Sequence, residues 1–90
     1  MVHVWGGYKC DSNGHIQINL PSLRSGYTYT DYGIIVMNSN TSYNIGNLIM
    51  YEAHINNNIA TLYYCTGTGD TKLNCTIYAG FLFLALKAEL

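Results

Sequence analysis

Hydrophobic and polar residues alternate with a period of two along much of this chain, a pattern typical of half-buried β-strands. In HIQINL (15–20), Ile16, Ile18 and Leu20 would face one side of a sheet and the polar residues between them the other. Segments of similar character, rich in Val, Ile, Tyr and Thr, lie at 2–9, 25–38, 48–55 and 59–66 and from about Lys72 onwards. The pattern therefore predicts about six strands and no helix.

Turn signals separate these segments. Asn13-Gly14 favours positive φ, and we expect it to join 2–9 to 15–20 as a hairpin. Three consecutive Asn residues at 56–58 predict a tight turn between 48–55 and 59–66. GTGDT (67–71) predicts a third hairpin before the last strand, and SNTSYNIGN (39–47) is expected to be a polar loop. Short strands joined in this way predict one antiparallel sandwich or barrel covering residues 1–90.

The C-terminal stretch IYAGFLFLALKAEL (77–90) has no charged side chain between Ile77 and Leu86. It is too short for a membrane-spanning helix, which needs about 20 apolar residues. A terminal helix is the alternative, because Leu, Ala, Lys and Glu are good helix formers. The β-rich residues before it and Gly80 favour a strand, in which Phe81, Phe83 and Ala85 would face one way and Leu82, Leu84 and Leu86 the other.

A strand with two apolar faces predicts contact with another subunit, because a chain of 90 residues has little left to cover the second face. Two other segments, 34–37 and 48–51, are also apolar on both sides. We therefore expect an oligomer. The alternative is a monomer in which these strands are central. The predicted interface residues are Ile34, Val36, Leu48, Met50, Leu82, Leu84 and Leu86.

The composition excludes some partners. Only 10% of the residues are charged, against about 25% in average globular chains, and the net charge is −1. The four basic residues are scattered, whereas nucleic acids and anionic membrane surfaces require clustered ones. We expect no nucleic-acid partner and no membrane insertion.

The ending YAGFLFLALKA resembles the closing strand of C1q and TNF-like jelly rolls. Together with GHIQINLPSL, YTYTDYGIIVMN and NNNIATLYYCTG, it also resembles the small trimeric head domains at the tips of phage tail fibres and other receptor-binding proteins. The resemblance implies a jelly-roll-like β-sandwich, a homotrimer, and attachment to a cell-surface glycan or protein through the trimer tip. It places the protein on a virion tail or another extracellular appendage.

Tyr and Asn residues are the candidate ligand-binding groups. Tyr rings offer flat apolar faces for the C–H surfaces of sugars, and Asn side chains supply donors and acceptors for hydroxyl groups. The same residues are also ordinary in strands and turns. The candidates are Tyr27, Tyr29, Tyr32, Asn38, Asn40, Tyr43 and Asn44. A stand-alone carbohydrate-binding module and a purely structural trimerisation or decoration domain are the alternative functions.

We expect no enzyme, cofactor or metal site. The histidines at 3, 15 and 54 lack the HxH or HExxH spacing of metal sites. The few carboxylates are scattered, so paired acid–base chemistry has no support. A hairpin centred on Asp70 would place Cys65 opposite Cys75, where a cross-strand disulfide or a buried thiol pair could form.

Overall fold

The computed structural model describes residues 1–30, 33–41 and 48–87, with residues 37–41 described by their backbone alone. Within these residues the chain forms eight strands and no helix, so none of them lies in a helix that could cross a membrane. The strands are β1 (Val2–Lys9), β2 (His15–Asn19), β3 (Tyr27–Tyr29), β4 (Ile35–Thr41), β5 (Leu48–Asn56), β6 (Ile59–Thr66), β7 (Thr76–Phe83) and β8 (Ala85–Lys87). The all-β prediction is confirmed.

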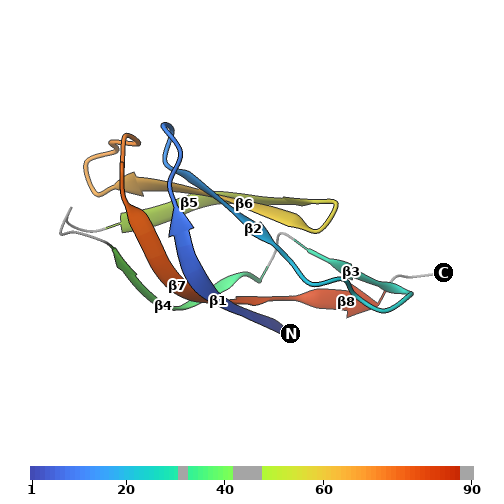
Figure 1. Ribbon diagram of the computed structural model, residues 1–90. Coiled ribbons are helices and arrows are strands. Elements are labelled where there is room, and N and C mark those ends of the chain that lie inside the picture. The colour runs from blue at the N-terminus through green and yellow to red at the C-terminus, as the bar shows by residue number, and fades with distance from the viewer. Residues whose placement is uncertain (31–32, 42–47, 88–90) are drawn as a thin grey trace.

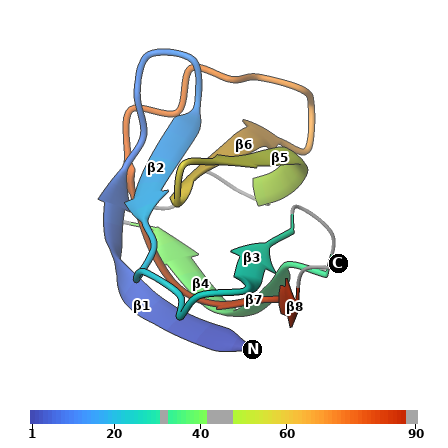
Figure 2. The same cartoon turned by 90° about the vertical axis from the view of Figure 1, so that its right-hand side faces the viewer.

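Two antiparallel three-stranded sheets, in the orders β1-β7-β4 and β2-β6-β5, face each other as a small β-sandwich (Figures 1 and 2). A two-stranded ribbon of β3 and β8 extends from one end, because β8 continues the line of β7. The chain crosses between the two three-stranded sheets from β1 to β2, from β2 to β4 by way of β3, from β4 to β5, and from β6 to β7. This winding between two layers is that of jelly rolls.

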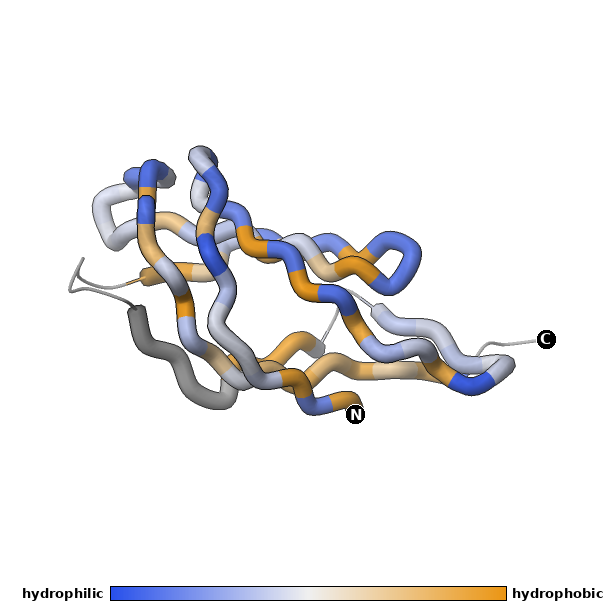
Figure 3. The backbone as a smooth tube through the Cα atoms, viewed as in Figure 1, coloured by the Kyte–Doolittle hydropathy of each residue, from blue (hydrophilic) through white to orange (hydrophobic). Residues whose placement is uncertain are grey.

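The core lies between the two sheets and is built from alternate strand positions (Figure 3). Ile77, Ala79, Phe81 and Phe83 of β7 are fully buried. From the opposite sheet, β2 and β6 contribute Ile16, Ile18, Ala60 and Leu62. Each large apolar side chain buried in this way stabilises the fold by about 1.5–3 kcal/mol. The predicted inward face of the 15–20 segment is confirmed.

The C-terminal stretch forms strands, as predicted, and the helix alternative is wrong for its described part. Phe81 and Phe83 are buried, whereas Leu82 and Leu84 are half-buried and Leu86 is exposed. The stretch is divided between β7 and β8 at Leu84, which belongs to neither strand. Its first face therefore enters the core of its own chain, and its second face is only partly covered.

Two of the three predicted hairpins are wrong. The β5–β6 hairpin is confirmed, with Asn57 and Asn58 at positive φ in its turn. However, β1 pairs with β7 and not with β2, and β6 pairs with β2 and β5 but not with β7. At both places the turn reverses the chain locally, but the following strand joins the opposite sheet. The predicted strand 25–38 is divided into β3 and β4, and β4 continues into the predicted loop as far as Thr41.

Candidate functional site

Two exposed aromatic rings lie on the outer face of the β1-β7-β4 sheet. In the β1–β7 ladder Trp5 is opposite Gly80, and Gly7 is opposite Tyr78. A Cβ atom on Gly80 would lie 2.6 Å from Cε3 of Trp5, and one on Gly7 would lie 2.8 Å from Cε1 of Tyr78. Each ring therefore lies across the backbone of the glycine opposite it. Both rings remain open to solvent, because Trp5 is 61% and Tyr78 47% exposed.

We call Trp5 and Tyr78 the aromatic platform. The two residues are diagonal neighbours in the ladder, since Tyr78 lies two positions before Gly80. Glycine has no side chain, so an aromatic ring on the neighbouring strand can cover its backbone. The strand pattern thus leaves two ring faces pointing away from the sheet, with no bulky side chain opposite them in this ladder.

Apolar and polar residues flank the platform along the sheet. Leu82 is opposite His3 in β1 and opposite Ile35, which is exposed, in β4. Asn38 is opposite Gly80 and Asn40 is opposite Tyr78 in the β4–β7 ladder. The register thus brings two of the predicted ligand-binding residues to positions beside the platform.

The other predicted ligand-binding residues do not join this site. Tyr27 and Tyr29 belong to β3 in the ribbon at the end of the sandwich. The Tyr29 hydroxyl donates a hydrogen bond to the Pro21 carbonyl at 2.6 Å, and the Arg24 guanidinium lies 4.8 Å from the centre of the Tyr27 ring. Both rings thus contact the segment that precedes β3. The remaining predictions, Tyr32, Tyr43 and Asn44, lie outside the described residues.

Trp5 and Tyr78 were not predicted from the sequence. The signal that could have found them is an aromatic residue with a glycine two positions later in two strands, WGG in β1 and YAG in β7. Its meaning depends on the pairing of β1 with β7, because only that register sets each aromatic residue opposite a glycine. The predicted hairpins paired both strands with other partners.

A second aromatic cluster lies on the β2-β6-β5 sheet. The His15 ring stacks on Tyr63 at 4.0 Å between centroids, and His54 and Tyr51 meet the same ring edge-on at 5.6 and 6.1 Å. His54 Nε2 lies 2.9 Å from Glu52 Oε2. Unlike the platform, this cluster consists of rings that pack on one another. Within the described residues, no group of three or more His, Cys, Asp or Glu side chains could hold a metal ion.

The predicted pairing of Cys65 with Cys75 is wrong. All three cysteines are free, and the strands that carry or adjoin these two residues lie in different sheets. Cys75 instead lies against Cys10, whose backbone N–H donates to the Cys75 carbonyl at 2.9 Å. Burial, followed by the neighbouring Cys75, raises the pKa of the Cys10 thiol to about 12. At neutral pH the thiol is therefore almost entirely protonated, which makes it a slow nucleophile.

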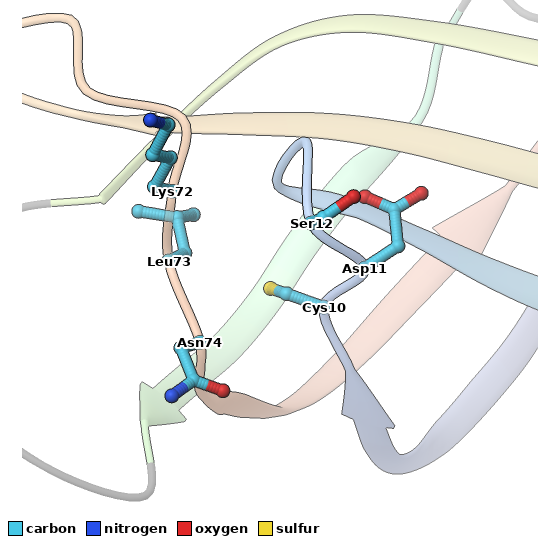
Figure 4. A pocket seen from close by; sticks show the side chains of 6 residues that line it. All are labelled: Cys10, Asp11, Ser12, Lys72, Leu73 and Asn74. Atoms are coloured by element: carbon cyan, nitrogen blue, oxygen red, sulfur yellow. The ribbon is translucent and has the colours of Figure 1, made fainter.

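A cavity of about 410 Å³ adjoins Cys10, between the turn after β1 and the segment before β7 (Figure 4). Asp11 and Ser12 lie on one side of it and Lys72, Leu73 and Asn74 on the other. The cavity does not include the aromatic platform.

The predicted interface residues differ in their surroundings. Ile34, Leu48 and Met50 pack against the core of their own chain. Leu82 and Leu84 are half-buried, and Val36 and Leu86 are exposed. The predicted interface residues that remain open to another subunit are therefore Val36 at the start of β4, Leu82 near the end of β7, Leu84 and Leu86.

No protein-family model matches the chain, and neither do any curated proteins or solved structures. We therefore infer the function from the geometry of the site.

Proposed function

We propose that this protein is a non-enzymatic binding module that recognises saccharide rings of a cell-surface glycan through the aromatic platform. The observation that carries the proposal is the position of Trp5, which lies across Gly80 while most of its side chain stays exposed. A large exposed aromatic residue on a sheet can bind a partner through its free face, because aromatic rings contribute strongly to interfaces. A pyranose ring, which is flat and presents C–H groups, matches that face.

Polar groups beside the rings would supply specificity. Saccharide recognition combines ring stacking with hydrogen bonds to hydroxyl groups, and amide side chains provide both donors and acceptors. Asn38 and Asn40 stand opposite Gly80 and Tyr78 in the register. The Tyr78 hydroxyl can also donate and accept. This combination supports a saccharide ligand over a purely apolar one.

The wider role that we propose is that of a receptor-binding head on a phage tail fibre or a similar trimeric appendage. The sequence resemblance and the half-covered apolar side of β7 and β8 support this role. In a trimer, three weak sites would bind a repeated surface glycan with much higher avidity than one. The platform would bind the ligand, and Leu82, Leu84 and Leu86 would contact the neighbouring subunits.

The test is binding of the whole chain to an array of immobilised bacterial and host saccharides. Tyr78→Ala and Trp5→Ala should each weaken retention at least tenfold, which corresponds to about 1.4 kcal/mol. Tyr51→Ala is the matched control, because Tyr51 is a similarly exposed aromatic residue, at 49%, on the other sheet. It should bind like the wild type.

Three results would count against the proposal or its wider role. Equal binding of the wild type and Trp5→Ala would remove the platform from the site. A change of oligomeric mass in Trp5→Ala, without any saccharide binding by the wild type, would favour the structural trimerisation or decoration domain. A monomer that binds saccharide through the platform would favour the stand-alone carbohydrate-binding module.

A further inference from the structure

Cys10 and Cys75 lie side by side where the β1–β7 ladder ends. Lys9 is the last residue of β1 and is opposite Thr76, the first residue of β7. The hydrogen bond from the Cys10 N–H to the Cys75 carbonyl, at 2.9 Å, extends this register by one pair. Both side chains are buried in the same core cluster, and Cys75 is close enough to raise the pKa of the Cys10 thiol.

This arrangement suits a disulfide bond. Directly opposed residues of an antiparallel ladder have Cα atoms about 4.5–5.5 Å apart, within the range of about 4.4–6.8 Å found in disulfides. We propose that Cys10 and Cys75 are a modification site, at which a small disulfide such as oxidised glutathione converts the two thiols into an intramolecular disulfide.

The cavity gives the oxidant access to one of the two sulfur atoms. The Cys10 side chain lines the cavity, whereas Cys75 is not among its lining residues (Figure 4). Its volume of about 410 Å³ is within the usual range of small-molecule pockets, about 300–1,000 Å³. Lys72 and Asp11 on its two sides carry opposite charges that match the carboxylates and amine of glutathione. Cys10 is therefore the first residue to react.

The reaction proceeds by two thiol–disulfide exchanges. The Cys10 thiolate, having given its proton to solvent, attacks one sulfur of oxidised glutathione and releases the first glutathione thiolate. The Cys75 thiol then gives its proton to solvent, and its thiolate attacks the Cys10 sulfur of this mixed disulfide and releases the second glutathione thiolate. Both released thiolates take up protons from solvent. Two protein thiols are oxidised by two electrons, and one glutathione disulfide is reduced to two glutathione thiols.

Burial of the two cysteines slows the first exchange but favours the disulfide that the second exchange forms. Burial raises the pKa of Cys10 to about 12, so little thiolate exists at neutral pH and the first exchange is slow. Below that pKa, the rate should rise about tenfold with each unit of pH. The product, by contrast, is uncharged and suits the apolar core that contains the two sulfur atoms. The bond would also hold together the two strands that carry the aromatic platform.

The test exposes the native full-length chain to oxidised glutathione, then unfolds it, alkylates the free thiols and maps the peptides by mass spectrometry. We expect a cross-link between the peptides of Cys10 and Cys75, with Cys65 alkylated, and a melting temperature that rises on oxidation and returns with dithiothreitol. Cys65→Ser should oxidise in the same way. Cys75→Ser should stop at the glutathione adduct on Cys10.

Other products would overturn the proposal. These are a cross-link that includes Cys65, or alkylation of both Cys10 and Cys75 after prolonged oxidation. Either outcome can be read from the wild-type chain and from Cys65→Ser, so the test does not depend on the folding of variants at the two core positions.

Discussion

The indole of Trp5 lies across the backbone of Gly80, its partner in the β1–β7 ladder. The position depends on a missing side chain, because a Cβ atom on Gly80 would lie 2.6 Å from the ring. One face of the indole is thereby directed to the sheet and the other to solvent. The smallest change that should disturb the platform is one methyl group on a different strand from the tryptophan.

Gly80→Ala should therefore move Trp5 and weaken saccharide binding at least tenfold, or by about 1.4 kcal/mol. The fold should persist, since the indole is exposed and can rotate away, and alanine in a strand interior lacks the entropic penalty of glycine. Trp5 is the only tryptophan, so its fluorescence emission reports the movement directly. Gly67→Ala is the matched control, because no other heavy atom lies within 4 Å of its Cβ position. Unchanged fluorescence and binding in Gly80→Ala would contradict the assignment.

Substitution by phenylalanine should have opposite effects on stability at Tyr64 and at Tyr29. The buried Tyr64 hydroxyl has no hydrogen-bond partner in the described part of the chain, and burial raises its pKa to about 12. Tyr64→Phe removes this unpaired group and should stabilise the protein by about 1 kcal/mol. Tyr29→Phe removes the bond to the Pro21 carbonyl and should destabilise it by about 1 kcal/mol. Urea unfolding measures both. A loss of stability in Tyr64→Phe would indicate a partner for its hydroxyl.

Local pattern predicted most of the strands, because alternation and turn chemistry are properties of neighbouring residues. The turn at Asn57 and Asn58 was predicted correctly for this reason. The turn before His15 is also local, since the Asp11 N–H donates to the His15 carbonyl and the Gly14 N–H to that of Asp11. What the turn residues do not specify is the sheet that the next strand joins. That choice depends on which apolar faces meet across the core.

The candidate site was not predicted, for a related reason. The sequence directed attention to the tyrosines between 27 and 43, where aromatic residues and amides are neighbours in the chain. Trp5 and Tyr78 lie near opposite ends of the chain and come together only through the β1–β7 ladder. A site made of residues on two distant strands requires the strand order, which the hairpin predictions did not give.

We expect the chain to self-associate through the partly exposed leucines near the end of β7 and in β8. Leu86 is 50% exposed, and Leu84 and Leu82 precede it at alternate positions. We expect a mass of three times 10.0 kDa by sedimentation equilibrium. Leu86→Glu should reduce the mass to that of one chain, because a carboxylate would be buried at the interface.

The control for Leu86→Glu is Ile49→Glu. Ile49 is an apolar residue of similar exposure, 47%, on the other sheet. It should leave the mass unchanged. A wild-type mass of 10.0 kDa would show that β7 and β8 need no neighbouring subunit.

The Asp11 carboxylate should stabilise the fold at neutral pH and lose this effect in acid. Its Oδ1 accepts the backbone N–H groups of His15 at 2.9 Å and Asn13 at 2.8 Å, and the first of these bonds is the main cause that lowers the carboxyl pKa below its ordinary 3.8. A lowered pKa in the folded state means that the stabilisation is complete above about pH 4 and is lost as the pH falls through the folded value. Nδ1 of His15, 3.7 Å from Oδ2, adds an attraction when the ring is protonated.

Asp11→Ala should therefore lower the melting temperature at pH 7, and the difference from the wild type should shrink as the pH falls below about 4. Differential scanning calorimetry between pH 7 and pH 2 measures this difference. Ser12→Ala, an exposed position in the same turn, should show a small difference that does not vary with pH. A gap between Asp11→Ala and the wild type that stays constant down to pH 2 would mean that the two backbone hydrogen bonds do not depend on the charge of the carboxylate. Equal melting temperatures of Asp11→Ala and the wild type at pH 7 would instead mean that the backbone bonds between Asp11, Gly14 and His15 alone stabilise the turn.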